Sequence, residues 1–132
     1  MDIIKYIHKK NIPVLGICLG MQQMGIFYNG KLKRIKNHYS PKKYCHGIKI
    51  NKNSKLYEIL KTEKINVNSR HNYCLINSDI TVSSKSGLVI ESIEDKEKNF
   101  FIGVQWHPED MFSYDYSSKR IFSSFIDACR GD

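Results

Sequence analysis

The fold is decided by one short stretch, Pro13-Val14-Leu15-Gly16-Ile17-Cys18-Leu19-Gly20. Its first part is apolar, as is typical of a buried parallel strand, and a helix-like sequence follows it directly. A cysteine at such a strand-to-helix corner is held in a strained backbone conformation, and glycines beside it avoid collisions with the neighbouring strand and helix. We therefore expect both Gly16 and Gly20 to be required sterically, with the Cys18 thiol presented at the edge of the sheet.

Cys18 has the features of a nucleophile. At a helix N-terminus, free amide hydrogens and the helix dipole favour the thiolate. A base is supplied late in the chain by Val104-Gln105-Trp106-His107-Pro108-Glu109, which follows a second apolar run at residues 100–104. Each motif alone also fits a structural turn or an ordinary histidine. Because open α/β sheets place their sites at the carboxyl ends of such strands, the combination predicts a cysteine triad of Cys18, His107 and Glu109.

Length and composition indicate one domain over residues 1–132, with 41% hydrophobic residues. No apolar run approaches the about 20 residues needed to cross a bilayer, and the N-terminal residues lack the features of a secretory signal. We therefore expect a cytoplasmic protein that does not bind membranes, with free thiols at positions 18, 45, 74 and 129. The pairs Cys45-His46 and His71-x-x-Cys74 lack the spacing of structural zinc sites, so no metal or other cofactor is expected.

The formal net charge of +8 suggests nucleic acid as a partner. However, the chain contains no recognisable nucleic-acid-binding motif, and its lysines are spread widely, so a solvated basic face is the favoured interpretation and no nucleic acid is expected. A basic segment at residues 31–43 leaves one alternative. If that segment borders the site, its lysines would attract a phosphate-bearing small substrate, because a lysine-lined cleft concentrates anions.

Periodicity and turn residues divide the chain into alternating helices and strands. We expect helices at 2–10, 20–28, 56–60 and 119–129, the third capped by Ser54. Strands are expected at 13–18, 47–50, 65–68, 80–83, 88–93 and 100–106, with 32–43 as a loop or short strand and 69–72 as a polar loop. The pattern predicts an α/β fold. Only one helix precedes the Cys18 strand, where a doubly wound sheet normally has a βαβ unit.

The stretches Gly16-Ile17-Cys18-Leu19-Gly20-Met21-Gln22 and Gly103-Val104-Gln105-Trp106-His107-Pro108-Glu109 closely resemble those of class I glutamine amidotransferase domains. More narrowly, the sequence resembles the γ-glutamyl-γ-aminobutyrate hydrolase branch, peptidase family C26. Three further stretches resemble the family's motifs in the same order, at residues 45–50, 67–71 and 87–91. The resemblance implies a flavodoxin-like, doubly wound mixed sheet that lacks its first strands, as in an N-terminally truncated or misassigned chain.

The resemblance also implies a role for each residue of the triad. Cys18 would attack a γ-glutamyl amide to give a γ-glutamyl thioester, His107 would carry the protons, and Glu109 would orient the imidazole. The backbone N–H of Leu19 would be one oxyanion donor. In the family, a second donor comes from a loop upstream of the position where this chain begins.

The same resemblance implies contacts to the glutamyl α-amino and α-carboxylate groups from Gln22 and from the backbone around Ser69 and His71. An alternative for Gln22 is a solvent-facing position on its helix. Tyr73 stands where the family often carries a glutamine, which leaves the recognition of the leaving group open.

The function expected from these features is hydrolysis of a γ-glutamyl amide, such as a γ-glutamyl amine or a γ-glutamyl nucleotide amidate like γ-glutamyl-CDP-amidate. Two alternatives stay open: a glutaminase subunit that supplies ammonia to a synthetase partner, and an inactive truncated binding module. Association as a homodimer is also left open. Because a sheet without its first strands exposes an edge and apolar faces, we expect weak activity and poor folding unless the chain is extended upstream.

Overall fold

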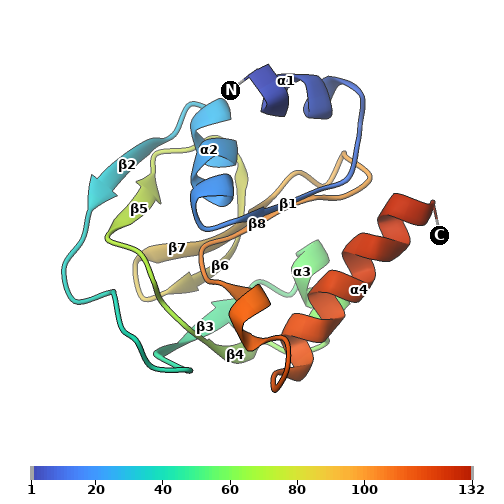
Figure 1. Cartoon of the computed structure of the whole chain (residues 1–132). Coiled ribbons are helices and arrows are strands. Elements are labelled where there is room, and N and C mark those ends of the chain that lie inside the picture. The colour runs from blue at the N-terminus through green and yellow to red at the C-terminus, as the bar shows by residue number, and fades with distance from the viewer. Residues whose placement is uncertain (1, 132) are drawn as a thin grey trace.

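The structure, a computed structural model, describes residues 2–131 and shows a mixed α/β arrangement (Figure 1). Its helices are α1 (Asp2–Lys9), α2 (Leu19–Phe27), α3 (Lys55–Leu60), α4 (Tyr116–Arg130) and the 3-10 helix η1 (Pro108–Met111). Its strands are β1 (Val14–Ile17), β2 (Lys31–Arg34), β3 (His46–Ile50), β4 (Lys64–Val67), β5 (Tyr73–Ile76), β6 (Thr81–Ser86), β7 (Val89–Glu94) and β8 (Phe101–Val104). The expected α/β class is therefore confirmed.

The main sheet has the strand order β1-β8-β7-β6-β3-β4. β1 and β8 are parallel, and each of the other neighbouring pairs is antiparallel. The sheet is thus mixed, as expected. A separate antiparallel pair, β2 and β5, lies beside α2. This second pair was not predicted.

Helices cover both faces of the main sheet, so the core has two parts. β8 contributes to both because successive side chains of a strand point to opposite faces. Phe101 joins a cluster with Met21 and Met24 of α2, whereas Ile102 and Val104 join a cluster with residues of α3 and α4. The strand sequence between Asn99 and Gln105 is apolar throughout, as a strand buried on both faces requires.

The strand directions bring particular chain ends to one edge of the sheet. β1 and β8 both end there, and the antiparallel neighbours β7 and β3 both begin there. This edge therefore collects Cys18 after β1, Gln105 and His107 after β8, Glu91 in β7 and His46 at the start of β3. Residues that are distant in the sequence become neighbours through this topology.

Several expected elements are confirmed with shifted ends. Ser54 caps α3 as predicted, since its Oγ accepts a hydrogen bond of 3.0 Å from the Tyr57 N–H. The final helix begins at Tyr116, three residues earlier than predicted, because Asp115 caps it by accepting a hydrogen bond from the Ser118 N–H. The strand expected over 100–106 ends at Val104, since Gln105 and Trp106 form a bend that leads into η1.

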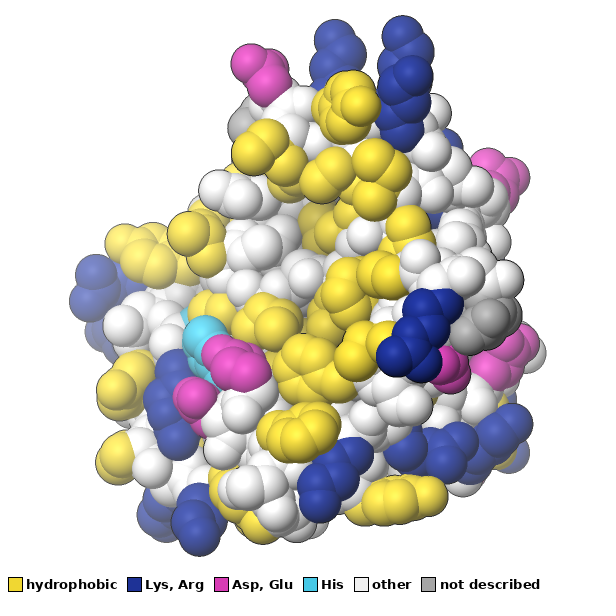
Figure 2. Space-filling view, turned by 45° about the vertical axis from the view of Figure 1, so that its right-hand side comes forward, with side chains coloured by type: hydrophobic (Ala, Val, Ile, Leu, Met, Phe, Trp, Pro, Cys, Tyr) yellow, Lys and Arg dark blue, Asp and Glu magenta, His cyan; other side chains and the backbone are white. Residues whose placement is uncertain are grey.

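One outer face of the molecule is apolar. In Figure 2, which is turned to bring the side of α4 forward, hydrophobic side chains form a broad band, with lysines and arginines at its margins. Exposed hydrophobic residues include Ile12 before β1, Leu19 in α2 and Ile126 in α4. β1 pairs with β8 on one side and has no partner strand on its other side within residues 2–131. None of the described helices combines the length and the apolar character needed to span a membrane.

Candidate functional site

Cys18 lies at a strained corner between β1 and α2. Its backbone has φ 51° and ψ −101°, a conformation that non-glycine residues rarely adopt. The corner is fixed to the neighbouring strand because the Cys18 N–H donates a 2.8 Å hydrogen bond to the Val104 carbonyl. The half-buried Cys18 thus stands at the end of β1, beside the end of β8.

The two glycines beside this corner differ in their surroundings. A Cβ atom at Gly16 would lie 2.3 Å from Met24 Sδ and 3.0 Å from backbone atoms of α2, so the prediction that Gly16 must be small is confirmed. A Cβ at Gly20 would meet no atom within 4 Å. The prediction of a steric requirement at Gly20 is therefore wrong, because its α-hydrogens face open space and not the strand.

The resting protonation state of Cys18 also differs from the prediction. Burial raises the pKa of the Cys18 thiol, and the negative charges of Glu109 and Glu91 add to this rise. A 3.5 Å hydrogen bond from Gln105 Nε2 to Sγ and the Leu19 N–H act in the opposite direction without reversing it. The expected stabilisation of the thiolate by the helix N-terminus is thus outweighed, and activation of Cys18 requires a base.

His107 and Glu109 form a close pair. Nδ1 of His107 lies 2.6 Å from Glu109 Oε2, so Nδ1–H donates to the carboxylate and Nε2 carries the free lone pair. Within residues 2–131, no hydrogen bond joins the His107 imidazole to Cys18 Sγ, which is instead held by Gln105. Catalytic hydrogen bonds are often long before substrate binds, so this separation is compatible with a role as base.

The backbone of His107 is fixed by Asn68, which sequence reasoning did not assign. The Asn68 side chain donates to the His107 carbonyl at 2.9 Å and accepts from the His107 N–H at 2.8 Å. Asn68 directly follows β4 and is buried. Residues 67–71 resemble a family motif, but no sequence pattern indicates that the Asn68 side-chain amide contacts the backbone of His107.

Two of the predicted substrate contacts lie on α2. Leu19 is the first residue of the helix, with its side chain exposed and its N–H directed toward the Cys18 sulfur. Gln22 is buried, which excludes the solvent-facing alternative. Its Nε2 donates to the Tyr73 carbonyl at 3.1 Å and to Gln105 Oε1 at 3.3 Å. Gln22 therefore orders the residue that contacts the thiol.

Ser69 and His71 lie in the loop between β4 and β5, and both are buried. The Ser69 hydroxyl donates to the His38 carbonyl, and the Ser69 carbonyl accepts a 2.9 Å hydrogen bond from the Ser40 N–H. His71 Nδ1 donates to the Tyr73 carbonyl at 2.7 Å. The Ser69 groups named here hold the segment after β2, so any contact to a substrate would come from other atoms of this loop.

Hydrogen bonds from Arg70 fix the basic segment after β2 to the loop between β4 and β5. Arg70 donates to the carbonyls of Ser40, Pro41 and Lys42. The segment is thereby anchored to the loop at 68–72, which also holds His107 through Asn68. These hydrogen bonds support the prediction that the basic segment borders the site.

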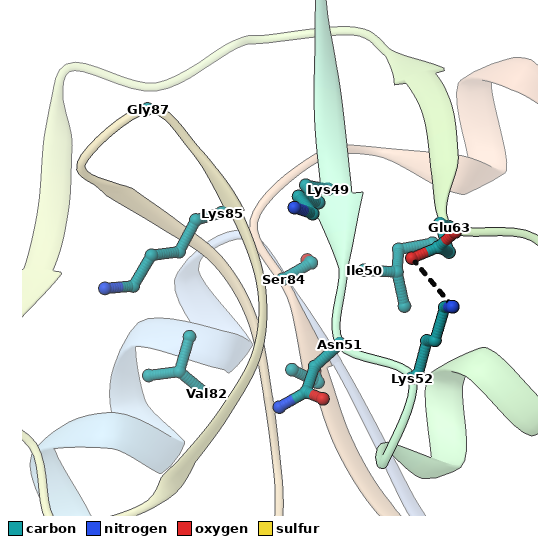
Figure 3. Close-up of a pocket in the computed structure, with 10 residues that line it drawn as sticks. Lys49, Ile50, Asn51, Lys52, Glu63, Val82, Ser84, Lys85 and Gly87 are labelled. Carbon is teal, nitrogen blue, oxygen red and sulfur yellow. Dashed lines mark ion pairs between the residues drawn. The ribbon is translucent and has the colours of Figure 1, made fainter.

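A separate pocket lies between β3 and β6, away from Cys18 (Figure 3). It has a volume of about 880 Å³, and an ion pair of 3.7 Å between Lys52 and Glu63 stands at one side. Lys49 of β3 and Lys85 of β6 are partners in the strand register, and the Lys85 side chain extends away from β3. Its lining contains none of the predicted site residues: Lys49, Ile50, Asn51, Lys52, Glu63, Val82, Ser83, Ser84, Lys85 and Gly87.

Comparison with known proteins gives the family. The peptidase C26 family model matches residues 1–109. A Schizosaccharomyces pombe protein named "Putative glutamine amidotransferase" is 34% identical over 94% of this chain and 53% of its own length. The glutamine-hydrolysing GMP synthase of Listeria monocytogenes is 34% identical over 92% of this chain and 23% of its own length. The chain therefore spans about half or less of the length of these relatives.

The fold has solved counterparts. The glutaminase domain of Trypanosoma brucei CTPS, determined with bound acivicin, superposes with a TM-score of 0.75 at 19% identity, covering 97% of this chain and 64% of that domain. The class I glutamine amidotransferase-like fold expected from the resemblance is thereby confirmed. Because the family model matches most of the chain, this chain belongs to the peptidase C26 family and forms a glutamine amidotransferase-like domain.

Proposed function

We propose that this domain hydrolyses the C–N bond of a γ-glutamyl amide through a γ-glutamyl thioester on Cys18. The observation that carries the proposal is the strained Cys18 corner, fixed to Val104 at the end of β8, with the His107–Glu109 pair three residues further on. This strain persists only because β1, α2 and β8 hold the corner, as is common for residues that must present a reactive atom.

The roles follow from the atoms available. His107 Nε2 takes the thiol proton while Sγ attacks the γ-carbonyl carbon, and the Leu19 N–H donates to the developing oxyanion. Collapse of the tetrahedral intermediate breaks the C–N bond, and the departing amine takes the proton from His107. Water then attacks the thioester with His107 as base, which releases glutamate and restores the thiol. Glu109 stabilises the imidazolium that forms twice in this cycle.

The raised pKa of the Cys18 thiol supports these roles, because a thiol nucleophile needs a base to take its proton. Gln105 donates to Sγ and keeps the sulfur oriented. Ser69 and His71, in the loop next to the site, stay proposed backbone contacts to the glutamyl group. No cofactor takes part in the proposed steps.

The direct test is release of glutamate from L-glutamine and from γ-glutamyl-4-nitroanilide, followed by coupled glutamate dehydrogenase. Cys18→Ser and His107→Asn should each lower the rate by about a thousandfold or more, since triad residues act as a unit. The exposed Cys129 provides a matched control, and Cys129→Ser should keep the full rate. Equal rates in Cys18→Ser and the parent protein would overturn the proposal.

A second candidate is a glutaminase function that supplies ammonia to a synthetase partner. The observation that favours it is the similarity to the Listeria monocytogenes GMP synthase, whose name describes hydrolysis of glutamine within a synthase. A glutaminase of this kind would turn over slowly alone and faster with its partner. Rapid turnover of a γ-glutamyl amine by the protein alone would favour the hydrolase instead.

A further inference from the structure

A group of ionisable side chains stands at the same edge of the sheet but outside the triad. His38 follows β2, His46 begins β3, His71 precedes β5, and Glu91 lies in β7. Glu91 has no exposed surface, and His71 is 5% exposed. A carboxylate buried this completely is rare unless it is paired or bound to a metal.

The two histidines nearest to Glu91 converge on one of its oxygens. His38 Nε2 lies 3.0 Å and His46 Nε2 lies 3.2 Å from Glu91 Oε2. One ligand atom from each of the three residues falls within 4.8 Å of the others. Ligand atoms bound to one tetrahedral Zn²⁺ at about 2.0–2.2 Å stand about 3.3–3.6 Å apart, so the two distances to Glu91 Oε2 are within a few tenths of an ångström of the edges of a coordination shell.

Two further atoms of the group have no polar partner in residues 2–131. They are Glu91 Oε1 and His71 Nε2, both buried. Because His71 Nδ1 donates to the Tyr73 carbonyl at 2.7 Å, Nε2 carries a bare lone pair. A backbone carbonyl on the other ring nitrogen is the usual support of a metal-binding histidine. The His71 ring lies 4.7 Å from that of His38, centroid to centroid.

We propose that His38, His46 and Glu91 bind a divalent transition-metal ion, with His71 as the fourth ligand, and that Zn²⁺ suits this donor set. Three imidazoles and one carboxylate are borderline donors of the kind that Zn²⁺ accepts in a tetrahedral site. On binding, His38 and His46 each release the Nε2 proton that now faces Glu91 and take up one at Nδ1.

Such a metal would join four separate parts of the chain: the segment after β2, the start of β3, the loop before β5, and β7. It would fix the basic segment, through His38, to β3 and β7. Glu91 also accepts a 2.8 Å backbone hydrogen bond from the N–H of Gln105, whose side chain contacts Cys18. We therefore assign the site a positioning role. It is independent of the hydrolase proposal, because Zn²⁺ binding is measured without any substrate.

The test is Zn²⁺ content after dialysis against a weak chelator, measured by mass spectrometry, together with titration calorimetry of Zn²⁺ into the metal-free protein. The parent protein should hold one Zn²⁺ per chain. His38→Gln removes a ligand that is partly exposed on a loop, and it should weaken Zn²⁺ binding at least tenfold. Co²⁺ should give the intense visible absorption of a four-coordinate site, and His71→Gln should weaken that absorption.

Matched controls separate this site from other metal-binding groups. His8→Asn removes a histidine beside Asp95, and Asp110→Asn alters the exposed group of His107, Glu109 and Asp110; both should retain one Zn²⁺. Cys45→Ser removes the thiol next to His46, and this variant should also retain one Zn²⁺. The proposal is overturned if the parent binds no Zn²⁺, or if folded His38→Gln and His46→Gln proteins, checked by circular dichroism, bind it as tightly as the parent.

Discussion

The surroundings of Cys18 favour its thiol over the thiolate. Burial raises its pKa, and the side-chain amide of Gln105 is the first of the groups that lower it. Removing this amide should therefore move the pKa further upward. The sign follows from the charge: a donor to the sulfur stabilises the thiolate, so its loss favours the thiol.

We predict that Gln105→Leu slows alkylation of Cys18 by iodoacetamide at pH 7.5 by about tenfold, because a hydrogen bond to a charged group contributes about 1.5 kcal/mol or more. The alkylation rate should rise with pH in both proteins, with the variant's inflection at higher pH. Gln23→Leu, on the exposed side of α2, is the control and should leave the profile unchanged. Superimposed profiles for Gln105→Leu and the parent would contradict this account of the thiol.

Asn68 holds the backbone of His107 from both sides. We predict that Asn68→Leu lowers the free energy of unfolding by about 1–3 kcal/mol, because it leaves two partly buried backbone groups of His107 without partners. It should also lower kcat more than it raises KM, since displacement of a base by about 1 Å can cost a hundredfold in rate. Asn66→Leu, exposed on β4, should change neither quantity.

Asn68→Asp refines this test, because a carboxylate accepts the His107 N–H but cannot donate to the carbonyl. An intermediate loss of stability is expected. A kcat in Asn68→Leu equal to that of the parent would show that His107 does not depend on this contact.

Sequence reasoning could propose Cys18, His107 and Glu109 as candidate catalytic residues because their spacing from apolar runs is a local property. It missed the contacts of Gln105, Asn68 and the buried Glu91, since each depends on which strands become neighbours. The order β1-β8-β7-β6-β3-β4 places β7 directly beside the β1–β8 pair and β3 two strands further on, and no local pattern encodes that order.

Among the elements, the junction of β1 and α2 provides a matched pair of glycines. We predict that Gly16→Ala lowers the free energy of unfolding by about 1–3 kcal/mol, because the added methyl meets Met24 and the backbone of α2. Gly20→Ala should instead raise it by about 0.5–1 kcal/mol, since glycine is unfavourable within a helix and the space is open. Urea unfolding measures both. Equal destabilisation by the two substitutions would contradict the packing described for this corner.

β5 was not expected as a strand because its sequence, Tyr73-Cys74-Leu75-Ile76, directly follows a polar loop and is only four residues long. Its partner β2 is exposed along its whole length and strongly basic, which resembles a loop in sequence. The pair forms because Leu75 packs against α2 at Gly25. Such tertiary packing overrides weak local preference.

For the whole molecule, the basic segment and its anchorage by Arg70 support recognition of an anionic leaving group. We predict that KM for γ-glutamyl-3-carboxy-4-nitroanilide rises about threefold between 0.02 and 0.3 M salt. Salt screens the attraction between the lysines and the carboxylate of this substrate at distances beyond about a Debye length. KM for the uncharged γ-glutamyl-4-nitroanilide should stay flat. A parallel rise for both substrates would remove the electrostatic explanation.

The molecule has an apolar band on one outer face, and β1 forms an edge of its main sheet. A sheet edge with exposed apolar residues nearby is prone to association with another strand. The relatives are about twice as long as this chain or longer. A form of the protein in which an added strand pairs with β1 should therefore unfold at a higher temperature than residues 1–132 alone, and thermal unfolding of the two would check this.

The central claim is that Cys18 is the nucleophile of a γ-glutamyl site. The most direct measurement is peptide-level mass spectrometry of the protein after exposure to acivicin or a diazo-ketone analogue of glutamine. We predict one modification per chain, confined to Cys18, absent in His107→Asn and slowed by added glutamine. Labelling spread over the half-buried Cys45 and the exposed Cys129, or unaffected by loss of His107, would contradict the account.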